Sequence, residues 1–246
     1  MGSDLRRLVS SVICCFCLIF LPLQGQQPSG DSSPDFEDLV VRAFGQDQEL
    51  VNGMQYYNKH SNSLGHPYFL QGSAHLGSVT IRGRLYSQVW LKYDIHAQQV
   101  EVEYRTINGA DNQVILVGDR LDEFTIEKNY FNRLKLDDEE GEQFYQVIIM
   151  DPLVLYIHWE KILVPGSGDS RYSKEFTSPK RDYFLEMEGK VYSFHNKGSY
   201  VKLFPKPIQK DLKKIIRSNY IQIRNATTDQ LELLLLAAGN LISGGE

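Results

Sequence analysis

Residues 77–105, GSVTIRGRLYSQVWLKYDIHAQQVEVEYR, decide the fold of this chain. Apolar and charged residues alternate strictly over residues 100–105, which is the period of a half-buried β-strand. Val89, Leu91 and Tyr93 repeat the two-residue period of apolar residues, and Val79 and Ile81 do so more briefly. Arg82-Gly83 provides a tight turn, since glycine adopts positive φ without steric cost. The stretch therefore predicts three antiparallel strands in sequential order.

Trp90 lies on the opposite face of its strand from Val89, Leu91 and Tyr93. A tryptophan on the nominal outer face predicts that something covers this face as well. The polar connection 94–98 has the length of a hairpin loop, and a turn-stabilising role is the simplest interpretation of Asp94.

The rest of the chain adds about seven more predicted strands, with short connections and no alternation of strands with long helices. They fall at 114–117, 124–126, 130–131, 143–150, 153–164, 183–187 and 190–194. Residues 153–164 are long for one strand and apolar on both faces, which indicates a central or bent strand. The predicted fold is α+β and mainly antiparallel β, a curled meander or barrel-like roll.

Helices are predicted at both ends of this body. Ser33-Pro34 begins the first with a capping hydroxyl and a proline at the first helical position, and Gly45 ends it. A second helix begins at Pro207. A third, strongly apolar helix follows the capping-box pair Thr227 and Gln230.

The first 25 residues have the features of a secretory signal peptide. Arg6-Arg7 precedes an apolar run that ends in a polar, glycine-containing segment. The run is too short for a stable membrane span, so we expect cleavage near Gly25 and export. An N-terminal anchor helix is the alternative.

All three cysteines, Cys14, Cys15 and Cys17, lie within the apolar run. The mature chain would contain no cysteine, which excludes disulfides, thiol catalysis and cysteine metal sites. The predicted organisation is a signal peptide over 1–25, a linker over 26–32, a β-rich body with its N-terminal helix over 33–196, and a helical segment packed on that body over 197–246.

Charge is distributed unevenly along the chain. Residues 26–196 contain 16 Lys and Arg against 26 Asp and Glu, whereas residues 197–217 contain seven basic residues and one acid. The basic residues of the second predicted helix are the candidate partner-binding residues: Lys206, Lys210, Lys213, Lys214 and Arg217. Ile208, Leu212 and Ile215 form its apolar stripe, so the cations should face outward. A solvated helix face, or one docked on the acidic body, is the alternative.

Several segments together resemble a family of exported proteins from Bacteroidetes-type bacteria. They are AFGQDQELVNGMQY, GHPYFL, GSVTIRGRLYSQVWLKYDI, ILVGDRLDEFTI and the closing stretch from KGSYVKLFPKP to LLLLAAG. The family pattern reads G-x-V-x-Y-x-G-x-x-Y-x-x-V-x-L-x-Y-D, and Ile81 stands here where the pattern has tyrosine. The resemblance implies an exported β-rich protein that lies in the periplasm, at the outer membrane or outside the cell. It transfers no catalytic residue, because the family has no established activity.

Common catalytic signatures are absent: the chain has no G-x-S-x-G, no H-E-x-x-H, no P-loop and no G-x-G-x-x-G. We therefore predict no cofactor and no metal site, although His60, His66 and His75 could converge. The acidic loop 137–142 lacks the spacing of a calcium loop, and residues 166–168 are expected to form a flexible loop.

Two classes of function remain. The first is a non-enzymatic envelope protein whose partner is another envelope protein or an anionic lipid or anionic glycan. Nucleic acid is not expected, because the basic helix lacks interleaved aromatic residues. The second is a periplasmic hydrolase or isomerase whose active site matches no recognised motif. A pocket that gathers Asp94 with Tyr93, His96 or His158 and shifts a pKa would favour the second class.

Overall fold

The computed structural model describes residues 48–51, 53–57, 59–106, 108–116, 118–136, 141–166 and 171–244. They belong to one compact unit, Val41–Glu246. The predicted signal peptide, the linker and the N-terminal helix lie outside the described residues, so those expectations stay predictions.

An eleven-stranded, antiparallel sheet dominates the fold, in the order β1-β6-β5-β4-β3-β7-β8-β9-β10-β13-β14. The strands are β1 (Met54–Gln55), β3 (His75–Ile81), β4 (Arg84–Asp94), β5 (Gln99–Arg105), β6 (Asp111–Ile115), β7 (Leu121–Ile126), β8 (Asn129–Leu134), β9 (Gln143–Met150), β10 (Leu153–Glu160), β13 (Lys180–Met187) and β14 (Lys190–Phe194). Mainly antiparallel β structure is thus confirmed. The expected barrel-like roll is not, because the order ends at β1 and β14 and no pairing among the described strands closes it.

The predicted meander is formed by β3, β4 and β5, and its inward side chains make the core. Val79, Leu91 and Val102 are fully buried. Arg82 and Gly83 both have positive φ, 51° and 77°, as a two-residue hairpin turn requires. Gly77 is needed for a different reason: a Cβ on this residue would lie 1.9 Å from the carbonyl oxygen of Thr125 on β7.

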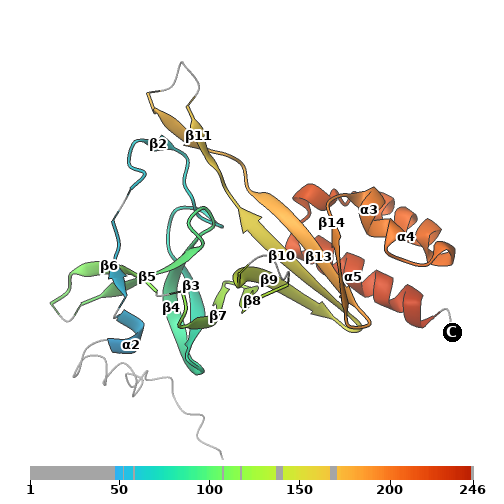
Figure 1. Ribbon diagram of the computed structural model, residues 1–246, viewed down its shortest axis with the longest axis horizontal. Helices are drawn as coiled ribbons and strands as arrows, with labels where there is room; N and C mark the ends of the chain where they lie inside the picture. The colour runs from blue at the N-terminus through green and yellow to red at the C-terminus, as the bar shows by residue number, and fades with distance from the viewer. Residues whose placement is uncertain are drawn as a thin grey trace, which may run out of the picture. The chain divides into compact units, whose positions relative to one another are not determined.

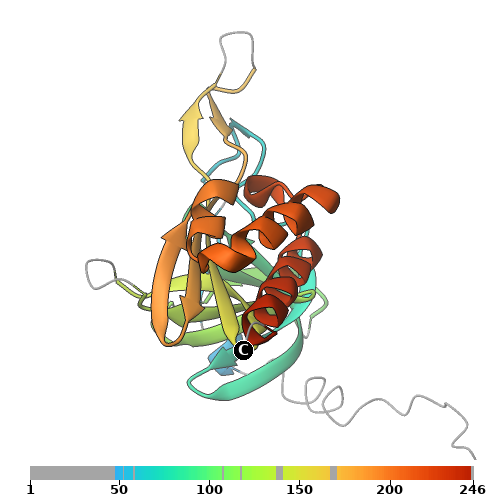
Figure 2. The same ribbon diagram turned by 90° about the vertical axis from the view of Figure 1, so that its right-hand side faces the viewer.

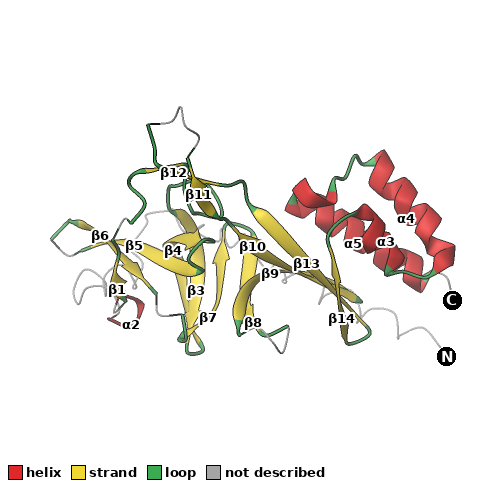
Figure 3. Cartoon of the chain, turned by 45° about the horizontal axis from the view of Figure 1, so that its top comes forward, coloured by secondary structure: helices red, strands yellow, loops and turns green. Residues whose placement is uncertain are grey.

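The long apolar segment 153–164 is bent, as one of its two interpretations predicted. It divides into β10 and β11 (Leu163–Pro165), because Lys161 leaves the large sheet and its N–H donates to the carbonyl of Ile95. β11 pairs with β12 (Lys174–Phe176), and β12 pairs in parallel with β2 (Ser63–Leu64). This small sheet is visible near the top of Figure 3.

Three helices at the end of the chain, α3 (Lys197–Lys202), α4 (Lys206–Ser218) and α5 (Thr228–Ser243), lie on one side of β9, β10, β13 and β14 (Figures 1 and 2). A single 3-10 turn, η1 (Ile223–Asn225), joins α4 to α5, and a short helix, α2 (Gln48–Val51), precedes β1. α4 and α5 confirm the predicted C-terminal pair. Their buried residues include Leu212, Ile216, Leu234 and Leu235, which continue the core of the sheet.

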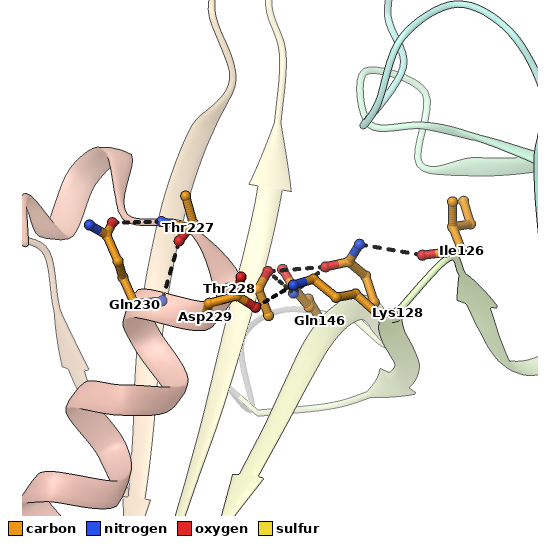
Figure 4. Close-up of polar contacts among 8 residues, drawn as sticks. Ile126, Lys128, Gln146, Thr227, Thr228, Asp229 and Gln230 are labelled. Atoms are coloured by element: carbon orange, nitrogen blue, oxygen red, sulfur yellow. Dashed lines mark hydrogen bonds and ion pairs between the residues drawn. The ribbon is translucent and has the colours of Figure 1, made fainter.

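A buried polar network attaches the start of α5 to the sheet (Figure 4). The Gln146 side-chain amide donates to Asn129 Oδ1 at 3.0 Å and to Thr228 Oγ1 at 3.2 Å. Trp159 Nε1 donates to Gln146 Oε1 at 2.9 Å. Lys128 and Asp229 form an ion pair at the exposed rim of this network.

Candidate functional site

The predicted partner-binding residues lie together on the exposed side of α4. Pro207 stands at the start of the helix, where its missing N–H is not needed. Leu212 and Ile216 are buried against the core, while Ile208 and Ile215 are half-buried at its margin. At 3.6 residues per turn, the five cations fall within an arc of roughly 100° on the opposite side. All five are exposed: Lys206, Lys210, Lys213, Lys214 and Arg217.

The same five side chains have no anionic partner in the part of the chain that the structure describes. The ion pairs found there connect strands, turns and the start of α5, and none reaches α4. The interpretation that α4 docks its cations on the acidic body therefore finds no support. Tyr220 follows the helix directly and is 87% exposed.

Asp94 lines a second feature, a pocket of about 310 Å³ between β5 and the segments 54–57 and 59–68, which contain β1 and β2. Asp94 Oδ1 accepts hydrogen bonds from the N–H groups of His96 and Ala97, at 2.8 and 2.7 Å. These are the bonds of a turn, so the simple interpretation of Asp94 is confirmed. Burial raises its pKa, and the two N–H donors oppose that rise.

Glu101 is the most deeply buried acidic residue that lines this pocket, since it is only 1% exposed. Tyr68 donates its hydroxyl to Glu101 Oε2 at 3.2 Å, and Gln113 Nε2 donates to the same oxygen at 2.5 Å. The Tyr56 hydroxyl lies 3.1 Å from that of Tyr68. Burial raises the pKa of Glu101 to about 7.

Lys161 is the buried cation of this region. Its ammonium donates to the carbonyls of His66 and Tyr68, at 2.8 and 3.0 Å. Burial lowers the pKa of Lys161, and the nearby Asp94 opposes that change. Two backbone acceptors hold this ammonium, so Lys161 secures the loop that covers β5 rather than facing a ligand.

The histidines do not converge as one alternative required. His60 lies with its ring 5.6 Å from that of His96, His66 stacks on Tyr68, and His75 contacts Glu127. Burial, then the proximity of His96, lowers the pKa of His60. Within the described ranges, no group of three or more His, Cys, Asp or Glu residues is arranged to hold a metal ion.

Other candidates from the sequence fall in different places. Residues 137–140 and 167–170 are outside the described residues. They include most of the acidic loop and most of the glycine-rich loop. Thr227 is the N-cap of α5 and forms the predicted capping box with Gln230. His158 lines a separate surface pocket beside His195 and is not near Asp94's pocket.

Glu101 was missed by the sequence because it occupies the outer, polar face of β5, where alternation predicts solvent. The tyrosines that cover it come from an irregular segment, and only their aromatic character marks that segment. Cross-strand pairing places Trp90 opposite Glu103 on the same outer face. The outer face of the sheet, which the sequence predicted to be covered, is therefore covered at Glu101. It is not covered at Trp90, which is 53% exposed.

No protein-family model matches the chain. No curated protein matches it either. Among solved structures, no match is found. The helices in the described part of the chain include none that is long and apolar enough to cross a membrane.

Proposed function

We propose that the protein is a non-enzymatic, exported envelope protein that binds an anionic membrane surface through the basic face of α4. One observation carries the proposal: five cations are exposed on one side of a helix, without an ion pair to any described carboxylate, in a chain of net charge −5. Like charges at this spacing repel by about 0.2–0.5 kcal/mol per pair. An anionic surface relieves that repulsion and contributes about 1 kcal/mol for each Lys or Arg beside it.

A lipid surface fits this face better than a nucleic acid does. The cations form a narrow stripe along one helix, and α4 contains no aromatic residue on which bases could stack. The exposed Tyr220 directly after the helix is of the type that favours the membrane–water interface. The apolar side of α4 is buried in the protein, so binding would be peripheral and mainly electrostatic.

A hydrolase or isomerase is the less favoured function, although two carboxyl groups with raised pKa line one pocket. Asp94 uses an oxygen to hold the turn that follows β4, and Glu101 is covered by Tyr68 and Gln113. Each carboxyl group thus has one oxygen committed to hydrogen bonds that hold a turn or a neighbouring segment in place. The hydrogen bonds of Glu101 hold Tyr68, and through it Tyr56, against the sheet.

The proposal is tested by reversing two charges, Lys210→Glu with Lys214→Glu, and measuring co-sedimentation with vesicles. Phosphatidylcholine vesicles with and without phosphatidylglycerol are compared at about 0.05 M salt, where the Debye length exceeds about 10 Å. Wild-type protein should bind only the anionic vesicles. The double variant should bind them at least about tenfold more weakly, because two attractions become repulsions.

A matched control is Lys174→Glu with Lys190→Glu, which makes the same change in net charge on exposed strand residues. It should bind vesicles nearly as wild type does. Neither double variant should alter the melting temperature appreciably, since exposed residues without partners contribute little to stability. Equal loss of binding in both variants, or none in the α4 variant, contradicts the proposal. Unfolding of the α4 variant would show that its lysines support the fold instead.

A further inference from the structure

A groove of about 590 Å³ lies over β4, β5 and β6, on a different part of the sheet from α4. Strand register places Trp90, Glu103 and Gln113 in one cross-strand row, and Arg105 pairs with Asp111 in the next. Tyr56, from the segment after β1, forms one wall. At about 4.8 Å per strand, the row of three side chains spans roughly 10 Å.

Trp90 provides an aromatic surface at one end of this row. Its side chain is 53% exposed, whereas the other tryptophan of the chain, Trp159, is 8% exposed and packs beneath Arg181. An exposed tryptophan in a groove is a large rigid surface that loses little conformational entropy on binding.

The polar groups beside Trp90 are paired with one another, so the groove carries little net charge. Glu103 forms an ion pair with Lys92, and Arg105 Nε lies 3.3 Å from Asp111 Oδ1. Each of these groups retains further donor or acceptor positions after its pairing. The groove therefore offers planar donors and acceptors around an apolar ring.

We propose that this groove binds a β-1,4-linked oligosaccharide of pyranose rings with equatorial substituents. Such a ring has a flat apolar face that packs on an indole, and a rim of hydroxyls that both donate and accept hydrogen bonds. The indole of Trp90 packs on the apolar face of the sugar ring. Glu103 and the Arg105–Asp111 pair form hydrogen bonds with its hydroxyls. The length of the row suits about two rings.

An extended peptide fits this groove less well. Peptides that add to a sheet need an unpaired strand edge. The floor here is β5, which is already paired with β4 on one side and β6 on the other. A strongly anionic ligand is disfavoured too, because Arg105, the cation that lines the groove, is already paired with Asp111.

The test uses cellotetraose and chitotetraose as probes, with tryptophan fluorescence and calorimetry as readouts. At least one of the two should give a saturable fluorescence change and a measurable heat. Trp90→Ala should raise its dissociation constant at least about tenfold, as truncation of a central aromatic anchor does. Trp90→Phe, which keeps a ring, should weaken binding less.

Leu85→Ala serves as the control, because Leu85 is an exposed apolar residue of the same strand and does not line the groove. It should bind as wild type does. The inference is overturned if neither tetrasaccharide binds at concentrations up to about 10 mM, above the range of weak single-site affinity. Equal affinity of Trp90→Ala and wild type overturns it as well. Vesicle binding of Trp90→Ala should be normal, which separates this outcome from failure of the α4 proposal.

Discussion

At the scale of single residues, Glu101 makes the strongest link between burial and a measurable property. This residue is 1% exposed, and burial raises the pKa of its carboxyl group to about 7. A solvated glutamate has a pKa of about 4.3. Between these two values the folded protein holds a proton that the unfolded chain has released. The free energy of unfolding therefore falls as pH rises through this window.

Replacing Glu101 with glutamine removes the titration and keeps the shape of the side chain. The wild-type free energy of unfolding should fall by about 1–3 kcal/mol more than that of Glu101→Gln between pH 5 and pH 8. Urea unfolding at several pH values measures both slopes. Leu85→Ala, an exposed change on β4 that removes no ionisable group, is the control and should retain the wild-type slope. Parallel curves for wild type and Glu101→Gln would show that Glu101 is not held in this environment.

The sequence could locate the α4 cations but not the burial of Glu101, for a physical reason. Helical periodicity alone determines which side of α4 faces solvent once its apolar stripe is known. The burial of Glu101 depends on Tyr56 and Tyr68, which come from an irregular segment with no period to extrapolate. Gly77 lies between these two cases. The family pattern contains this glycine, but the reason for it, the close approach of the Thr125 carbonyl, follows only from the pairing of β3 with β7.

At the scale of elements, the attachment of α5 to the sheet depends on Gln146. This side chain is 1% exposed and joins β9 to Asn129, Thr228 and Trp159 at once. A buried polar group that loses its partner costs about 1–3 kcal/mol. Removing the Gln146 side chain would leave several buried polar groups without a hydrogen-bond partner. Removing the Thr228 hydroxyl would leave the other hydrogen bonds of Gln146 in place.

We therefore predict that Gln146→Ala lowers the free energy of unfolding by about 3 kcal/mol. Thr228→Ala should cost about 1 kcal/mol, as should Thr227→Ala, which removes only the N-cap bond to Gln230. Chemical denaturation of the three variants gives the comparison. Three equal losses would mean that α5 is held by its apolar face and that the network adds nothing.

The elements that the sequence predicted are those with local signals. The capping box of Thr227 and Gln230 begins α5, and the Glu188-Gly189 turn joins β13 to β14. The helix α3 was missed because its six residues are too few to show an apolar period, and its signal is only a capping box of Asn196 with Ser199. The break at Lys161 follows from contacts with the distant loop 66–68.

At the scale of the whole molecule, the two proposed surfaces belong to different elements. The basic face belongs to α4, which packs on α3 and α5, while the groove is formed by β4, β5 and β6. Their chemistry differs as well. One is a stripe of cations without an ion pair to any described carboxylate, and the other is an aromatic ring among paired charges. Neither surface contains a residue of the other.

The last prediction follows from this separation: membrane binding and oligosaccharide binding should be independent. Coupled sites change each other's affinity by about 5–150-fold, and the change is reciprocal. Saturation with phosphatidylglycerol vesicles should leave the dissociation constant for the bound tetrasaccharide within about twofold of its value in solution. Lys210→Glu with Lys214→Glu should bind the tetrasaccharide as wild type does. A reciprocal shift beyond about fivefold would contradict independence and would indicate that the helices and the meander respond to ligands as one element.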